Sequence, residues 1–265
     1  MIRQRGHCRS FLLVSIASAI VFPMALAFAG EANDPNVVTE EEKKAGFELL
    51  FDGKGLDGWQ QSGNWIVEDG AISRAKKGGG LTYPAKMIPD DFELRFEWKV
   101  GEGSNSGVYY RPGQYEYQIL DNQRHRDGRN PRTSAASLYF CIAPSKDATK
   151  PVGQWNCGRV VCKGTVVQHW LNGEKVIDMD YSDPKYAADV ERLSIRGADL
   201  TARGRNLLFQ DHGDPVSYRG IKLRTLGEDD ELDRTPVEPM AIPEEALKYE
   251  QQILERIRQR RTKKK

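Results

Sequence analysis

The chain between residues 47 and 226 alternates between apolar and polar positions. The clearest case is residues 92–100, Phe-Glu-Leu-Arg-Phe-Glu-Trp-Lys-Val, in which every second residue is apolar. Successive side chains of a strand point to opposite faces, so this period of two predicts a strand with one buried face. Shorter apolar runs bounded by turn residues predict further strands at 47–51, 64–67, 71–74, 138–143, 155–163, 166–171, 175–179, 207–210 and 216–226. Many short strands without helical periods predict an all-β fold, a sandwich or a jelly roll.

Residues 105–111 and 115–121 are predicted to pair as a hairpin. The turn Arg111-Pro112-Gly113-Gln114 joins them, because Pro fixes φ and Gly tolerates the chain reversal. Positions 115, 117 and 119 are Tyr, Tyr and Ile, and we expect them to face the core. Glu116 and Gln118 then lie on the opposite face, about 6.5–7 Å apart. This polar row suits a sugar-binding concavity, and the alternative interpretation is the solvated outer face of an antiparallel sheet.

The two ends of the chain differ from this pattern. Residues 1–29 combine a basic start, an apolar run at 11–22 and a close on small residues, which predicts a signal peptide and an exported, periplasmic or extracellular protein. Residues 30–46 form a polar segment, either disordered or with a short helix at 39–44. Residues 227–265 form an acidic linker and then a basic helix, which is predicted to be solvated or docked on the domain.

Charge and cysteine content narrow the range of partners. The formal net charge of +1 gives no reason to expect nucleic acid or an anionic membrane as a partner. The apolar run near the N-terminus is too short for a comfortable membrane span. Removal of the signal peptide leaves Cys141, Cys157 and Cys162, which allow at most one bridge. Cys157 and Cys162 either face each other across a hairpin or are buried thiols, and no Cys/His spacing resembles a structural zinc site.

Eight short motifs follow one another in the order typical of one family. They are Leu50-Phe51-Asp52-Gly53 with Leu56-Asp57-Gly58-Trp59, residues 65–70, residues 91–98, Asn105-Ser106-Gly107 with Tyr110-Arg111, residues 115–121, Gly153-Gln154-Trp155-Asn156, His169-Trp170-Leu171-Asn172-Gly173, and Gln210-Asp211-His212-Gly213 ahead of Tyr218-Arg219. Residues 47–226 thus resemble the 3-keto-disaccharide hydrolase family, also described as 3-keto-glucoside lyase/hydratase domains. Gly220, where the family usually has Asn, and Ala135-Ala136-Ser137 depart from the family pattern.

The resemblance implies a concanavalin-like jelly roll whose concave sheet acts on 3-keto-glycosides. In such sugars the C3 carbonyl acidifies the C2 proton, so that the glycosidic bond can break by elimination, with water added afterwards. This chemistry needs a base at C2, a group that holds the enolate oxygen and an acid for the leaving group. The row of Glu116, Gln118 and Leu120 lacks the second carboxylate of a retaining glycosidase, which favours elimination and hydration over double displacement.

Three residues are candidates for the chemistry. Glu116 is the first choice for general acid/base, and its alternative role is an ordinary surface carboxylate. His169 is a second candidate, because a neutral imidazole suits proton abstraction near pH 7, and otherwise it is a hydrogen-bonded histidine within the sheet. Arg111 can hold the ketone or enolate oxygen, or it pairs with Glu116 and only fixes the hairpin.

Seven further residues are candidates for substrate binding: Asn105, Gln118, Asp121, His125, Trp155, Asn156 and His212. No residue spacing demands a cofactor, and Glu116, Asp121 and His125 together are a candidate site for a divalent metal ion, so the metal requirement stays open. The expected partner is a small-molecule or oligosaccharide substrate, and the oligomeric state stays open. The alternative function is a non-catalytic carbohydrate-binding module of the same fold. A basic-tailed interaction protein is a third hypothesis, which rests only on the Lys/Arg run at the C-terminus.

Overall fold

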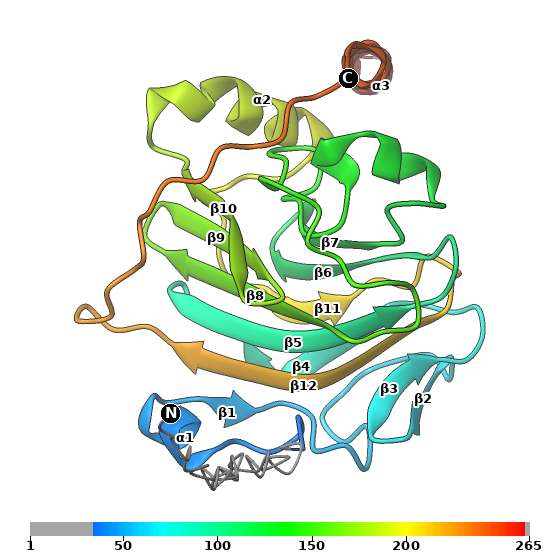
Figure 1. The fold of residues 1–265 in the computed structure, drawn as a ribbon, viewed down its shortest axis with the longest axis vertical. Helices are drawn as coiled ribbons and strands as arrows, with labels where there is room; N and C mark the ends of the chain where they lie inside the picture. The colour runs from blue at the N-terminus through cyan, green and yellow to red at the C-terminus, as the bar shows by residue number, and fades with distance from the viewer. Residues whose placement is uncertain (1–33, 263–265) are drawn as a thin grey trace, which may run out of the picture. The chain divides into compact units, whose positions relative to one another are not determined.

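The computed structural model describes residues 34–262, which form a sandwich of two antiparallel sheets (Figure 1). The expected signal peptide lies outside the described residues. The larger sheet has the strand order β10-β9-β8-β5-β12-β3-β2, and β1 pairs with β12. Its strands are β1 (Glu48–Leu49), β2 (Trp65–Glu68), β3 (Ala71–Arg74), β5 (Phe92–Val100), β8 (Asn156–Lys163), β9 (Val166–Leu171), β10 (Glu174–Asp180) and β12 (Val216–Thr225).

The smaller sheet has the order β4-β11-β6-β7. Its strands are β4 (Leu81–Met87), β11 (Asn206–Phe209), β6 (Asn105–Arg111) and β7 (Tyr115–Leu120). The predicted all-β sandwich and the central hairpin are therefore confirmed. One predicted strand is wrong, and one observed strand was not predicted. Residues 138–143 form turns with isolated bridges, and β4 was not predicted, because Pro84 interrupts its apolar pattern.

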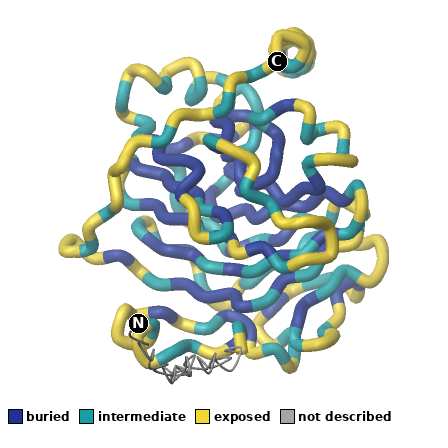
Figure 2. Tube along the Cα trace, in the orientation of Figure 1, coloured by how far each residue is buried: buried dark blue, intermediate teal, exposed yellow. Residues whose placement is uncertain are grey.

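The core lies between the two sheets, and the buried residues follow the strands of both (Figure 2). The inner face of β5 contributes Phe92, Phe96 and Trp98, all almost completely buried. Phe96 packs edge-on against Tyr117 of the smaller sheet, with ring centroids 5.2 Å apart. At about 25 cal/mol for each Å² of apolar surface removed from water, these large side chains supply much of the stability of the sandwich.

His169 of β9 belongs to this core. Its side chain points between the sheets, where Nδ1 lies 2.9 Å from the carbonyl oxygen of Ala136 and Nε2 lies 2.6 Å from the hydroxyl of Tyr110. The carbonyl can only accept, so Nδ1 carries the proton and Nε2 accepts from Tyr110. Burial lowers the pKa of His169 to about 4. The imidazole is therefore neutral and fully engaged at pH 7.

Within the described residues, three α-helices lie outside the sheets. α1 (Glu40–Lys44) is the short helix expected at 39–44, and Thr39 and Glu42 form a capping box at its start. α2 (Ala187–Arg196) contradicts the prediction of strands and turns throughout residues 47–226. α3 (Glu244–Thr262) is the expected C-terminal helix. Among residues 34–262, no helix has both the length and the apolar character that crossing a membrane requires.

α3 docks through one buried carboxylate. Glu250 is 3% exposed, and it accepts hydrogen bonds from Asn130 Nδ2 at 2.7 Å and from Arg132 Nη1 at 2.8 Å. Arg192 of α2 lies 3.9 Å from the same carboxylate, and Arg258 of α3 pairs with Glu191 of α2 at 3.0 Å. A buried carboxylate with two cationic partners fixes the register of α3 against α2 and the loop after β7.

The three cysteines within residues 34–262 are free thiols. Cys157 and Cys162 lie on the same strand, β8, so they do not face each other across a hairpin. Their odd separation places them on opposite faces of the sheet, Cys157 exposed and Cys162 buried. Cys141 is also a buried thiol.

We expect the His169 ring to remain neutral, as a single tautomer, down to about pH 5. An unfolded histidine titrates near pH 6.5, so the unfolded chain binds more protons than the folded chain between about pH 6.5 and pH 4. The contribution of His169 to stability is complete above pH 6.5 and is lost as the pH falls through this window. Nitrogen-15 NMR of the ring at a series of pH values measures this directly. Titration near pH 6.5 in the folded protein would contradict it.

Candidate functional site

Glu116 lies on the outer face of the smaller sheet, opposite the core. It pairs with Tyr109 of β6, whose hydroxyl donates a hydrogen bond to Glu116 Oε2 at 2.9 Å. Gln210, just after β11, donates from Nε2 to the Tyr109 hydroxyl at 3.1 Å. Glu116 of β7, Tyr109 of β6 and Gln210 just after β11 therefore form one run of side-chain hydrogen bonds on this face. The prediction from alternation is confirmed for this face.

Gly107 makes room for this carboxyl group. A Cβ atom built on Gly107 would lie 1.9 Å from Glu116 Oε1 and 2.7 Å from its Cδ, far inside van der Waals contact. Gly107 pairs with Gln118, so it is the neighbour diagonal to Glu116 across the hairpin. The glycine of the Asn105-Ser106-Gly107 motif is thus explained by the side chain that it admits.

Burial changes the acidity of Glu116. The residue is 3% exposed, and desolvation is the main cause that raises the pKa of its carboxyl group to about 8. The Tyr109 hydrogen bond and the charge of Arg196 act in the opposite direction but do not compensate. Burial also raises the pKa of Tyr109 above its ordinary value. Glu116 is therefore mostly protonated at pH 7 and can exchange its proton near neutrality.

An aromatic and cationic cover lies over this end of the hairpin. The backbone N–H of Tyr139 donates to the carbonyl oxygen of Glu116 at 3.0 Å. Arg196, in the last turn of α2, lies over the rings of Tyr139 and Phe140, at 4.8 and 4.6 Å from their centroids. Sequence reasoning missed Tyr109, Tyr139, Arg196 and Gln210 as site residues. Only Gln210 carried a signal, because it stands in a family motif.

The other end of the same face carries two histidines. The ring centroids of His125 and His212 lie 6.2 Å apart. His212 Nδ1 lies 3.4 Å from Asp214 Oδ2, and the same oxygen accepts from the backbone N–H of Asn105 at 3.1 Å. Asn105, His125 and His212 are therefore brought together. Asn105 and Tyr109 are four positions apart on β6, or about 13 Å, so this face is elongated.

Gln118 lies between these ends and is fully buried. Its Nε2 donates to the carbonyl oxygen of Thr133 at 3.3 Å, and its Oε1 has no hydrogen-bond partner within residues 34–262. A buried acceptor without a donor costs about 1–3 kcal/mol, so an unpaired amide oxygen beside Glu116 is a candidate for binding a substrate hydroxyl.

Asp121 is engaged by the backbone. Its carboxylate accepts hydrogen bonds from the N–H groups of Gly103, Gln123 and Arg124, at 2.7, 3.1 and 3.3 Å. This arrangement orders the loop after β7 and uses the oxygens that a metal ion or sugar would need. In the part of the chain that the structure describes, no three His, Cys, Asp or Glu side chains are grouped as metal ligands.

Arg111 and His169 do not join Glu116. A bulge between Tyr109 and Arg111 inserts one residue into β6, so Arg111 pairs with Tyr115 and turns to the core side. There it donates to the carbonyl oxygen of Asp90 and lies 5.5 Å from the Phe92 ring centroid. Neither the contact with Glu116 nor the salt bridge expected between them is present in the described residues. His169 lies on the far side of the smaller sheet, in the core.

Asn156 is the first residue of β8 in the larger sheet, and Trp155 directly precedes it. Trp155 has Arg219 and Lys99 over its ring, at 4.1 and 4.8 Å from the centroid. Asn156 Oδ1 accepts from the backbone N–H of Lys150 and from Asn172 Nδ2, at 2.8 and 2.9 Å, so this side chain orders a loop. The structure therefore separates both residues from the Glu116 face.

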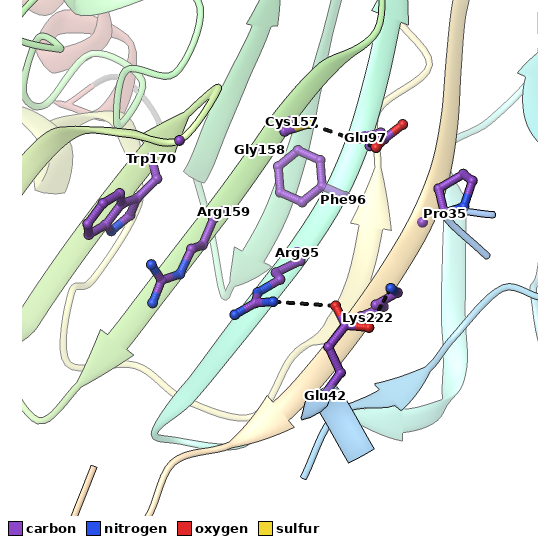
Figure 3. A pocket seen from close by; sticks show the side chains of 12 residues that line it. Pro35, Glu42, Arg95, Phe96, Glu97, Cys157, Gly158, Arg159, Trp170 and Lys222 are labelled. Atoms are coloured by element: carbon purple, nitrogen blue, oxygen red, sulfur yellow. Dashed lines mark hydrogen bonds and ion pairs between the residues drawn. The ribbon is translucent and has the colours of Figure 1, made fainter. Parts of the chain in front are cut away.

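A hollow of about 300 Å³ opens on the outer face of the larger sheet (Figure 3). Its charged residues neutralise one another, since Glu42 pairs with Lys222 at 2.7 Å and with Arg95 at 3.4 Å. Glu93 lies beside it, fully buried, and burial raises its pKa while the guanidinium groups of Arg159 and Arg95 more than compensate. The pKa of Glu93 therefore falls below its ordinary value. The carboxylates of Glu42 and Glu93 are held ionised, so they are better suited to a structural role than to proton transfer.

The Glu116 face is therefore the candidate active site. It combines a carboxyl group that titrates near neutral pH, an adjoining phenol, a cation on the cover and an unpaired amide oxygen. Strongly perturbed acidity at a cluster of polar groups is typical of functional sites. Such a site can move a proton to and from a bound molecule and stabilise negative charge that develops on it.

Known proteins agree with this fold and with the sequence motifs. The family model described as "3-keto-alpha-glucoside-1,2-lyase-like domain" matches residues 46–224. A 3-keto-disaccharide hydrolase of Bacteroides thetaiotaomicron is 32% identical over 237 residues, which cover 68% of this chain and 79% of the relative.

Two crystal structures of proposed glycosyl hydrolases from Parabacteroides distasonis are also similar. One has a TM-score of 0.64 and 28% identity, and the similarity covers 72% of this chain and 99% of that protein. The other has a TM-score of 0.56 and 27% identity, over 68% of this chain and 99% of that protein. Because the family model spans both sheets and the Glu116 hairpin, the chain belongs to the family of 3-keto-α-glucoside-1,2-lyase-like domains.

Proposed function

We propose that this chain cleaves 3-keto-glycosides, 3-keto-disaccharides among them, by elimination at the glycosidic bond followed by hydration. Family membership and the similarity to the Bacteroides thetaiotaomicron enzyme make it a 3-keto-disaccharide hydrolase-like glycosyl hydrolase. The observation that carries the finer proposal is the buried Glu116 carboxyl group, whose pKa is raised to about 8. A general acid/base works best when its pKa lies near the operating pH.

Glu116 moves one proton twice in the proposed reaction. Its ionised form takes the C2 proton, and the electron pair of the C–H bond passes into an enolate on the C3 oxygen. The pair then returns to form the C1–C2 double bond as the bond from C1 to the leaving oxygen breaks. Glu116 gives its proton to that oxygen, and water adds across the new double bond. Tyr109, whose hydroxyl donates to the carboxylate, holds Glu116 in place.

The remaining polar groups of the face are proposed to bind hydroxyl groups. Gln118 offers an unpaired Oε1, and Asn105, His125 and His212 line the other end, about 13 Å away along β6. A substrate with two sugar rings would contact both ends of the face.

Direct hydrolysis is the second candidate mechanism, and Asp127 favours it. Asp127 lies in the 3-10 helix Arg126–Arg129, and its negative charge raises the pKa of Glu116. A second carboxylate near a protonated one is the arrangement of a glycosidase, with Glu116 as acid and Asp127 as base or nucleophile. The two mechanisms differ in the fate of the C2 proton.

Glu116→Gln is expected to lower the rate of 3-keto-glycoside cleavage by at least a factor of about 100, as for the loss of a general acid/base. In wild type, kcat/KM should rise about tenfold per pH unit below pH 8 and level off above it, because elimination needs ionised Glu116. In deuterated buffer, NMR should show deuterium at C2 of the released keto sugar. Glu102→Gln, at an exposed carboxylate, is the matched control.

Two other outcomes would contradict cleavage by elimination. Activity that falls above pH 8, without deuterium at C2 and with strong loss in Asp127→Asn, supports direct hydrolysis. Binding of the substrate without turnover in wild type leaves a carbohydrate-binding module and refutes the enzyme.

Gly107→Ala is expected to abolish activity while the sandwich still folds. The new methyl group would lie 1.9 Å from Glu116 Oε1, so the carboxyl group must leave its position beneath Tyr109. Gly55→Ala is the control, because no atom lies within 4 Å of its added Cβ. Circular dichroism and kcat/KM measure the two effects. Wild-type kcat/KM in Gly107→Ala would show that the position of Glu116 does not matter.

Glu116→Gln is also expected to stabilise the protein at high pH. The folded state holds a proton on Glu116 up to about pH 8, while an unfolded glutamate loses it near pH 4.5. The wild-type free energy of unfolding therefore falls as the pH rises from about 4.5 to 8, by a few kcal/mol at about 1.36 kcal/mol per pKa unit. Urea unfolding at pH 5, 7 and 9 should show a flatter dependence in the variant. Parallel curves for both proteins would contradict the raised pKa.

A further inference from the structure

Arg196 is an arginine without a partner on the cover of the site. No hydrogen bond or ion pair of its guanidinium group is present within residues 34–262, and its Nε is buried without an acceptor. Other arginines nearby have carboxylates, as Arg132 has Glu250 and Arg192 has Asp189. Arg196 as a whole is only partly buried, but buried donors are almost always paired, so its unpaired Nε suggests an acceptor that arrives from outside the chain.

The position of Arg196 is set by aromatic packing instead. Its guanidinium carbon lies 4.8 and 4.6 Å from the ring centroids of Tyr139 and Phe140. Stacking over aromatic rings holds the planar group in one orientation and leaves its N–H donors in the plane free. Tyr139 in turn is bonded to the backbone of Glu116.

Its charge reaches the reacting groups. The positive charge of Arg196 lowers the pKa of Glu116 and also acts on Tyr109 and Tyr139, against the larger effect of burial. The other charged or titratable groups that face Glu116 are Asp127 and, through Tyr109, Arg205. Arg196 is therefore the cation that acts directly on Glu116.

We propose that Arg196 donates hydrogen bonds to the C3 carbonyl oxygen of the bound 3-keto-glycoside and stabilises the enolate formed there. This inference rests on the proposed function. When Glu116 removes the C2 proton, the electron pair collects on the C3 oxygen, and a guanidinium group held in place over two aromatic rings stabilises that charge. The role that the sequence suggested for Arg111 thus passes to a residue of α2.

The C-terminal helix is a positioning element for this arginine. Glu250 of α3 contacts Arg192, which lies one turn before Arg196 on α2, and Arg132 of the loop that follows β7. Arg258 adds a pair with Glu191. α3 lies beyond residues 46–224, so a segment outside the matched family domain holds part of the active site.

The test compares Arg196→Gln with wild type on a 3-keto-glucoside, over a range of pH values. We expect kcat to fall about 100-fold or more with a smaller change in KM, as for the loss of an oxyanion donor. The rising limb of the pH profile should move to higher pH, because the charge that lowers the pKa of Glu116 is gone. Arg196→Lys should return the rising limb of the pH profile to its wild-type position but should recover only part of the wild-type kcat. Arg124→Gln, at an exposed arginine paired with Glu102, is the control.

Glu250→Ala tests the positioning role through a double-mutant cycle. The single variant should lower kcat and move the limb in the same direction, and adding it to Arg196→Gln should change neither further. Glu255→Ala, at an exposed position of α3, is its control.

Wild-type kcat and an unmoved limb in Arg196→Gln, with circular dichroism showing that it is folded, overturn the inference and leave the proposed function intact. If Arg196→Gln does not fold, wild-type kcat in Arg196→Lys overturns it equally. If wild type itself does not cleave 3-keto-glucosides, the proposed function fails and the inference fails with it.

Discussion

The site depends on one carboxyl group that is buried without a counter-ion. Glu116 fits into the smaller sheet only because Gly107 has no side chain, and its one strong contact is a neutral phenol, Tyr109. A phenol stabilises a carboxylate less than a guanidinium or ammonium group does, so desolvation prevails and the proton is retained near neutrality. The hairpin, its bulge and the cover over it all serve to keep that environment.

Glu93 shows what the same residue type does in the other sheet. It is as deeply buried as Glu116, but Arg95, Arg159 and Arg224 lie 2.8, 2.7 and 2.9 Å from its oxygens. Three cations hold it ionised, and its pKa falls instead of rising. Burial alone therefore does not make a catalytic carboxyl group. The difference lies in the partners, and only Glu116 is left free to gain and lose a proton at neutral pH.

The sequence predicted the sandwich well because its strands are half-buried, and half-burial imprints a period of two on the chain. The same alternation placed Glu116 on the outer face. It failed for Arg111, because the bulge in β6 turns that residue to the core, and a bulge leaves no mark in a polar–apolar pattern. It also failed for Tyr139 and Arg196, which reach the site by tertiary packing of a loop and of α2. The helix at residues 187–196 was missed because strands and turns were predicted throughout residues 47–226.

Glu116 and Arg196 come from different parts of the fold, which explains why the sequence predicted the position of Glu116 but not that of Arg196. Glu116 lies on the β6–β7 hairpin inside residues 46–224, where strand pairing fixes its position. The cation lies on a ten-residue helix whose orientation is set by Tyr139, Phe140 and the buried Glu250 of α3. The position of Glu116 thus depends on contacts within one hairpin, whereas the orientation of Arg196 depends on α3, a helix that lies beyond the matched residues.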